Sequence, residues 1–296
     1  IQSLTLIKFM YFYRRLLIVF LSILLGVVLA IGCASRSPSG EKLVIGVVSY
    51  DAGASSIDKY ENFQNYLAAQ TKSIVELEPA FNELTAVEEV KRGVWSIVFA
   101  PPGLAAIAIK QQNYLPIFSM AGLRNVRSVI VVNNNSRLQN LDDLSNSIVA
   151  LGQPGSAAGY YLPLYDLYGL TLKEVRFAPT PKTVLQWLSQ GKVDAGALSE
   201  ADFELYHHEF EQKGLRILHT TRSAPPSIVL LQSSIDAESR QQIIEAMKAA
   251  APSTIGDAGY LPDAPIPNYE QFIKIVEKVR PLETQVKEKP AVLIFK

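Results

Sequence analysis

The stretch LVIGVVSY at residues 43–50 decides the fold class. It is a continuous apolar run rich in β-branched residues, which is typical of a strand buried on both faces of a sheet. After a polar loop, the helical spacing of Tyr60, Phe63 and Leu67 predicts a helix over residues 57–71. The order repeats with a strand at 74–77, a helix at 84–91 and a strand at 97–100. This order predicts βαβ units and an α/β fold, with a mainly parallel sheet flanked by helices.

The second half of the chain repeats the scheme. Strands are predicted at 128–132, 147–151, 175–178, 193–198 and 227–231, and helices at 141–144, 183–189 and 237–250. Two similar units joined by extended segments near 126–132 and 221–230 predict two lobes connected by hinges. We assign residues 43–127 to lobe 1, 128–222 to lobe 2, and 223–296 to a segment that returns to lobe 1.

Two loops follow the carboxyl ends of predicted strands, where ligands bind in folds of this kind. Tyr50 and Asp51 follow the first strand, and Pro102 and Gly103 follow the strand at 97–100. We therefore expect these four residues to contribute to a ligand site.

A third loop, GQPGSAAGY at residues 152–160, is rich in glycine and leads into a helix. Its glycines allow close approach of the backbone to a ligand, and the helix directs free N–H groups and its positive dipole end toward the loop. This arrangement favours an anion without any basic side chain. The candidate residues are Ser156, Ala157, Ala158, Gly159 and Tyr160. The alternative is an ordinary βα turn in which Ser156 only caps the helix.

Composition limits the function of the chain. Of its 296 residues, 48% are hydrophobic, which excludes disorder. The 28 basic residues balance the 28 acidic ones, so no overall positive field indicates a nucleic-acid partner. Residues 1–32 hold three basic residues and no acid, which leaves 25 basic and 28 acidic groups and a net charge of −3 in the remainder.

The N-terminal segment is typical of an export signal. Arg14 and Arg15 precede an apolar run over residues 16–31, whose length of about 24 Å as a helix is short of the ~30 Å hydrocarbon core. LAIGC at residues 29–33 resembles the lipobox of bacterial lipoproteins, in which the cysteine is lipidated. We expect a signal peptide at 1–32, a lipidated Cys33 and a tether at 33–42; an uncleaved membrane anchor is the alternative. Either way, the remainder lies outside the cytoplasmic membrane.

Three segments in order resemble the periplasmic binding proteins for phosphonate, phosphite and phosphate. They are SVIVV with NLDDL (128–132 and 140–144), GQPGSAAGYYLP (152–163) and QGKVDA (190–195). The resemblance implies the type II periplasmic binding protein fold and capture of a solute between two lobes for an ABC importer. Its implied partners are a small anionic ligand, the importer permease and, through the lipid, the membrane; we expect a monomer.

The resemblance also implies roles for single residues. Tyr50 matches an aromatic position of the family, and Asp194 lies in its QGKVDA segment. Ala157 and Ala158 replace hydroxyl residues that hold the phosphonate, and Lys182 replaces an acid that holds an ammonium group in aminoalkylphosphonate binders. These departures favour a phosphonate-like or other organic anion without an amine.

Two other functions are compatible with the same fold. The first is a sensory accessory protein that reports its ligand to a membrane kinase. The second is a ferric-ion binder, because Tyr160 and Tyr161 resemble the paired tyrosines of such proteins. No nucleophile elbow or Ser-His-Asp order is present, so we expect neither an enzyme nor a cofactor. His207 and His208 are adjacent on a predicted helix and point in different directions, so we expect no metal site.

Overall fold

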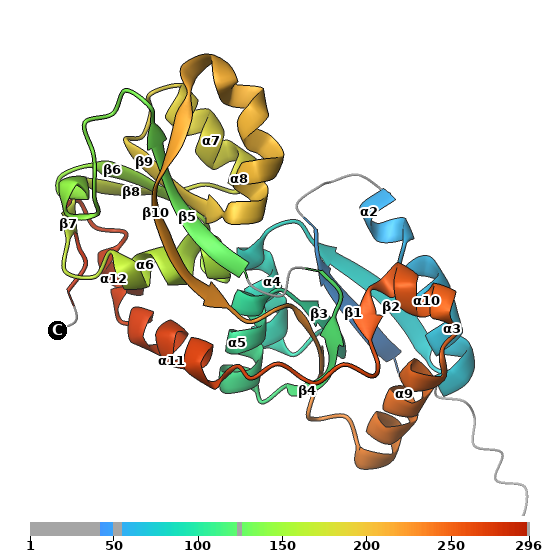
Figure 1. Cartoon of the computed structure of the whole chain (residues 1–296). Helices are drawn as coiled ribbons and strands as arrows, with labels where there is room; N and C mark the ends of the chain where they lie inside the picture. The colour runs from blue at the N-terminus through green and yellow to red at the C-terminus, as the bar shows by residue number, and fades with distance from the viewer. Residues whose placement is uncertain (1–41, 50–54, 123–125, 295–296) are drawn as a thin grey trace, which may run out of the picture. The chain divides into compact units, whose positions relative to one another are not determined.

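The computed structural model describes residues 42–49, 55–122 and 126–294. The apolar run that begins at Leu43 forms a strand next to the edge of a six-stranded sheet. Strand β1 (Lys42–Val48) pairs in parallel with β2 (Ile74–Ala80) and β3 (Ile97–Ala100). The strand order is β12-β4-β11-β3-β1-β2 (Figure 1). β11 (Ile228–Leu231) pairs antiparallel with β3 and with β4 (Leu115–Met120), and β12 (Tyr260–Leu261) pairs antiparallel with β4.

The helices of this sheet include one that the sequence did not predict. α5 (Pro102–Gln112) begins at the prolines interpreted as the end of a strand, since proline is favoured in the first turn of a helix. The helix predicted over 57–71 is divided into α2 (Ser55–Asp58) and α3 (Glu61–Thr71). The remaining helices of this part are α4 (Glu83–Arg92), α9 (Ala237–Ala249) and α10 (Pro252–Ala258).

The second sheet has five strands in the order β10-β5-β9-β6-β8. They are β10 (Leu215–Ala224), β5 (Val126–Asn133), β9 (Ala195–Ser199), β6 (Ile148–Leu151) and β8 (Glu174–Phe177). Its helical segments are η1 (Asp142–Leu144), η2 (Ala157–Tyr161), α6 (Leu162–Asp166), α7 (Pro181–Ser189), α8 (Glu200–Tyr206) and η3 (His207–Lys213). The predicted α/β class with two sheets is confirmed. Each sheet is mixed in strand direction, because β11 and β5 introduce antiparallel pairs.

The C-terminal segment, residues 223–296, contributes β11 and β12 to the first sheet and then leaves that sheet. α11 (Glu270–Val279) contacts α5 and α6, and α12 (Leu282–Gln285) follows it. The last strand, β13 (Ala291–Val292), pairs antiparallel with β7 (Thr171–Leu172), which lies between α6 and β8. The chain therefore leaves the first sheet after β12 and ends beside elements of the second (Figure 1).

A single apolar cluster connects the two sheets. It contains Leu104 of α5, Tyr160 of η2 and Phe272 of α11, all nearly inaccessible to solvent. Separate clusters lie between the first sheet and α3 and α9, and between the second sheet and α7. Among the described residues, no helix combines the length and the apolar character needed to cross a membrane.

Candidate functional site

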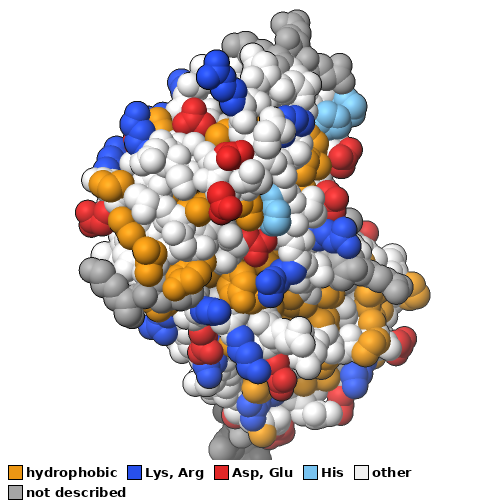
Figure 2. All heavy atoms as spheres, turned by 60° about the vertical axis from the view of Figure 1, so that its left-hand side comes forward, with side chains coloured by type: hydrophobic (Ala, Val, Ile, Leu, Met, Phe, Trp, Pro, Cys, Tyr) orange, Lys and Arg blue, Asp and Glu red, His pale blue; other side chains and the backbone are white. Residues whose placement is uncertain are grey.

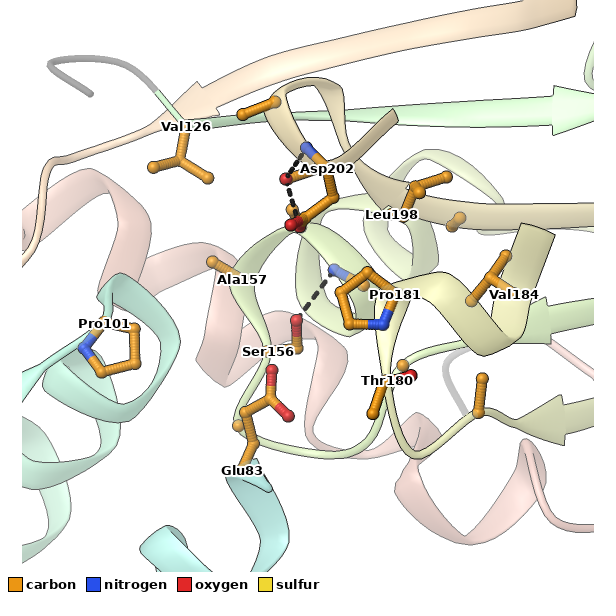
Figure 3. A pocket seen from close by; sticks show the side chains of 18 of the residues that line it. Glu83, Pro101, Val126, Ser156, Ala157, Thr180, Pro181, Val184, Leu198 and Asp202 are labelled. Atoms are coloured by element: carbon orange, nitrogen blue, oxygen red, sulfur yellow. Dashed lines mark hydrogen bonds between the residues drawn. The ribbon is translucent and has the colours of Figure 1, made fainter. Parts of the chain in front are cut away.

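A cavity of about 240 Å³ lies where elements of both sheets meet. The beginnings of α4 and α5, helices beside the first sheet, line one part of the cavity. The loop after β6, the beginning of α7 and the end of β9, all at the second sheet, line the other part (Figure 3). β6 and β9 are parallel neighbours, so their carboxyl ends open at the same edge. The volume is below the ~300 Å³ at which drug-sized pockets begin, so the cavity suits a small ligand.

The glycine-rich loop forms one wall of this cavity. Ser156 has an extended backbone and caps the following helix, with its Oγ accepting a hydrogen bond from the Gly159 N–H at 3.0 Å. The Gly152 N–H donates to the Gly159 carbonyl at 2.8 Å and closes the loop. Ala157 and Ala158, each 5% exposed, follow the cap and line the cavity. Ser156 therefore both caps a helix and lines the cavity.

Two glycines allow the loop to pack against the first sheet. A Cβ on Gly103, in the first turn of α5, would lie 2.0 Å from the Gly155 carbonyl oxygen and 2.7 Å from the Ala157 nitrogen. Gly155 has φ +109°, and a Cβ there would lie 2.8 Å from the Cβ of Glu83 on α4. The loop thus contacts both helices at distances that only glycine permits.

The charged residues that line the cavity are both acids. Glu83, in the first turn of α4, is 5% exposed. Asp202, in the first turn of α8, accepts a 2.5 Å hydrogen bond from the Ser199 hydroxyl, while its own N–H donates to Ser199 Oγ at 2.9 Å. Burial raises the pKa of Asp202 above its usual value, and the Ser199 bond partly opposes this shift. None of the described lining residues is Lys, Arg or His.

The structure brings most of the loop candidates together at the cavity. Pro102, Ser156, Ala157, Ala158 and Gly159 line it, and Gly103 packs directly against the loop. Tyr50, Asp51 and Cys33 lie outside the described residues.

Tyr160 is placed in the apolar core and does not line the cavity. It is fully buried, its ring meets that of Tyr161 edge-on at 5.1 Å, and burial raises the pKa of both phenols. Neither tyrosine is among the lining residues.

Lys182 and Asp194 are not brought to the cavity. Lys182 forms an ion pair with Glu209 of η3 at 2.6 Å, and its Nζ lies 5.5 Å from the centre of the Tyr206 ring. Asp194 is exposed, and its Oδ2 accepts a 2.7 Å hydrogen bond from the Ile148 N–H at the beginning of β6. That is the opposite end of the strand from Gly152.

Five polar lining residues were not predicted from the sequence: Glu83, Thr180, Ser199, Asp202 and Ser227. Ser199 ends β9, so it lies at a strand carboxyl end, where a ligand contact is expected. Thr180 caps α7, with its Oγ1 accepting from the Thr183 N–H at 3.3 Å. Glu83 has no local signal, because its place at the cavity depends on how α4 packs against Gly155.

The histidines contribute to no metal site that the described part of the chain contains. His207 Nδ1 lies 2.9 Å from the Phe203 carbonyl oxygen, and the His207 and His208 rings are 3.8 Å apart. Within residues 42–49, 55–122 and 126–294, no three His, Cys, Asp or Glu side chains are grouped so that they could hold a metal ion.

A small cavity lined by elements of two mixed sheets is typical of a protein that binds a small solute. A family model described as "ABC transporter, phosphonate, periplasmic substrate-binding protein" matches residues 45–276. The chain belongs to this family of transport proteins, which is extracytoplasmic, is not a family of enzymes and works with ABC transporter permeases.

Solved structures share the fold at low sequence identity. XAC2383 from Xanthomonas citri bound to chloride ion is 20% identical, with a TM-score of 0.67 over 81% of this chain and 98% of that one. PhnD1 from Prochlorococcus marinus in complex with methylphosphonate is 19% identical, with a TM-score of 0.64 over the same shares. A binding protein component of an ABC phosphonate transporter from Pseudomonas aeruginosa is 14% identical, with a TM-score of 0.58 over 75% and 80%. These likenesses support the fold.

Proposed function

We propose that the chain captures a small phosphonate-like anion in the cavity between the sheets and delivers it to an ABC importer. The observation that carries this proposal is the position of residues 156–159, which resemble the phosphonate loop of the family and line the cavity. The Gly159 N–H already donates to Ser156 Oγ, so the donors proposed for the anion are the backbone N–H groups of Ala157 and Ala158, in the first turn of the helix. The phosphonate-binding relatives support the same ligand class.

The charged residues that line the cavity indicate which chemical groups the rest of the ligand carries. The expectation that the ligand lacks an amine depended on Lys182, which is paired with Glu209 outside the cavity. Asp202 and Glu83 line it instead, and both oppose a second negative group on the ligand. We propose that the anionic head lies against residues 157–159 and that a hydrogen-bond donor or a cationic group lies toward Asp202.

A pair of variants at Ala157 tests the anion site. Ala157→Asp adds a carboxylate to the cavity wall, and Ala157→Asn adds nearly the same volume without charge. An acid in the first turn of a helix is compatible with folding. We expect Ala157→Asp to bind methylphosphonate at least about tenfold more weakly than Ala157→Asn, as one nearby like charge predicts. Calorimetric titration of methylphosphonate, phosphite, phosphate and 2-aminoethylphosphonate is the measurement. Equal affinities in the two variants would mean that the anionic head of the ligand does not lie against this wall of the cavity.

We further propose that a lipid on Cys33 anchors the protein at the outer face of the membrane. The lipobox-like LAIGC segment supports this, and firm anchoring needs two or more acyl chains, since one gives only marginal binding. Cys33→Ser is expected to leave the precursor uncut or to accumulate processing intermediates. An unchanged mature mass with membrane retention in this variant would contradict the assignment.

A further inference from the structure

A second hollow, which we call the basic groove, lies beside the segment that joins β10 to β11. It has a volume of about 690 Å³, nearly three times that of the ligand cavity. Its walls are residues 222–226, residues 267–268, one side of α11 and Tyr165 of α6. Figure 2 turns the side that carries α6 and α11 toward the viewer, and basic side chains stand there beside an apolar patch.

Every charged residue that lines the groove is basic. Arg222 comes from the end of β10, and Lys274 and Lys278 lie one helical turn apart on α11. All three side chains are exposed. In a chain whose formal net charge is zero, three positive charges in one hollow that no acid lines are a marked local excess. A pair of lysines at this helical spacing slightly destabilises the helix that carries it.

Two of these cations have no acid beside them. Within the described residues, no carboxylate lies within ion-pair distance of Arg222 or Lys274. Glu277, on the same helix as Lys274, turns instead toward Lys110 of α5 at 3.6 Å. The protein therefore has an acid on α11 and uses it outside the groove.

Tyr165 holds two of the cations close together. The Arg222 guanidinium carbon lies 4.4 Å from the centre of the Tyr165 ring, and Lys278 Nζ lies 5.2 Å from it. Attraction by the ring offsets part of the repulsion between two positive groups that share it. The opposite wall is also fixed, because the Tyr269 hydroxyl donates a 2.6 Å hydrogen bond to the Pro226 carbonyl.

We propose that the basic groove is a second anion site, for a small molecule that carries at least two phosphate charges. Arg222 supplies a planar guanidinium that can contact two phosphate oxygens, and Lys274 and Lys278 add point charges on the facing helix. Asn268 and Gln271 line the same hollow and add amide donors. The ligand cavity offers no cation among its described lining residues, so the two sites select anions by different means.

Calorimetric titration with inorganic pyrophosphate into the purified full-length protein tests the proposal. We expect saturable binding at one site, and at least about tenfold weaker binding in Arg222→Gln/Lys278→Gln, because two charge-assisted contacts are lost. The matched control is Lys91→Gln/Lys248→Gln, which removes the same charge from exposed positions on α4 and α9. In that control the affinity is expected to be unchanged.

Two further titrations distinguish the groove from the ligand cavity and from a site for lipid head groups. Ala157→Asp is expected to lose affinity for methylphosphonate and to bind pyrophosphate as the wild type does. Arg222→Gln/Lys278→Gln is expected to lose affinity for pyrophosphate and to bind methylphosphonate as the wild type does. Glycerophosphoglycerol, the soluble head group of an anionic lipid, carries one charge and is expected to bind more weakly than pyrophosphate. Two results with pyrophosphate would overturn the proposal: no binding at roughly 10 mM, or loss of binding in Ala157→Asp. Equal weakening in the lysine control, or tighter binding of the lipid head group, would overturn it as well.

Discussion

The cavity between the two sheets and the basic groove are neighbours along the chain and opposite in charge. Ser227 lines the cavity, and Pro226, the residue before it, lines the groove. The cavity is small, and its charged lining residues are Glu83 and Asp202, whereas the groove is larger and lined by three cations. A net charge of zero therefore conceals a local separation of charge between two neighbouring hollows.

The largest expected effect is at Gly103, where the cavity depends on contact between the two sheets. In Gly103→Ala the new Cβ would meet backbone atoms of residues 155 and 157, which cannot move aside as a flexible side chain can. If closure of the cavity requires this contact, the closed form is disfavoured. A closed population reduced to 1% lowers the apparent affinity for methylphosphonate roughly a hundredfold.

Folding of Gly103→Ala is expected to be preserved, since alanine in place of glycine favours a helix by about 1 kcal/mol. Gly256→Ala on α10 is the matched control, because a Cβ there meets nothing within 4 Å. Thermal unfolding and calorimetry of both variants are the measurements. Loss of the folded state in Gly103→Ala would show that the contact is permanent, and unchanged affinity would show that the cavity does not need it.

The second prediction concerns Asp202, which gives the cavity its acidic character. Asp202→Asn keeps the shape and a partner for Ser199 but removes the charge. We expect the affinity for 2-aminoethylphosphonate to fall about tenfold, because an ammonium group loses a partly buried partner. Methylphosphonate, which has no amine, is expected to bind at least as tightly as before. Calorimetry with both ligands is the measurement, and an equal change for both would mean that the ammonium group does not approach Asp202.

Asp202 also predicts how stability depends on pH. Its pKa in the folded state is raised above the ordinary 3.8, so folding favours the protonated carboxyl. The corresponding stabilisation is fully present below about pH 4 and is lost as the pH rises through the folded-state pKa. The free energy of unfolding of the wild type, relative to Asp202→Asn, should therefore decrease as the pH rises from this value. Urea unfolding at several pH values measures it, and a constant difference would contradict the raised pKa.

Parts of both the fold and the site were predictable from the sequence because they depend on local signals. The buried run at β1 and the repeated strand–helix order indicated the α/β class, and the loop at 152–159 was identified by its glycines and its resemblance. The cavity's acids were not predictable, since Glu83 and Asp202 reach it only through packing of α4 and α8. Lys182 follows Pro181, which lines the cavity, yet its side chain extends toward η3. The direction of such a side chain depends on how its helix is rotated about its own axis. The sequence alone does not determine that rotation.

A fourth prediction addresses the groove. Tyr165→Leu keeps an apolar side chain of moderate size but removes the aromatic face that holds Arg222 and Lys278 together. We expect pyrophosphate to bind about threefold more weakly, in line with roughly 0.5–1 kcal/mol for an exposed cation–π contact. Methylphosphonate binding is expected to be unchanged, because Tyr165 does not line the cavity. Calorimetry of the two anions separates the sites, and a loss shared by both would indicate a general effect on folding.

The smallest expected effect is at Lys182, which lies near the cavity by sequence but belongs to neither hollow. Its ammonium group and the Glu209 carboxylate are each about half exposed and form an ion pair, so their fields largely cancel at the cavity and water screens what remains. Lys182→Gln is expected to change affinity for methylphosphonate and 2-aminoethylphosphonate less than about twofold and stability by at most about 1 kcal/mol, as for surface ion pairs. Glu209→Gln and the double variant complete a double-mutant cycle in which the pair's own coupling is measured by unfolding. A reversal of the ligand ranking in Lys182→Gln that Glu209→Gln does not share would place the lysine's charge in the cavity after all.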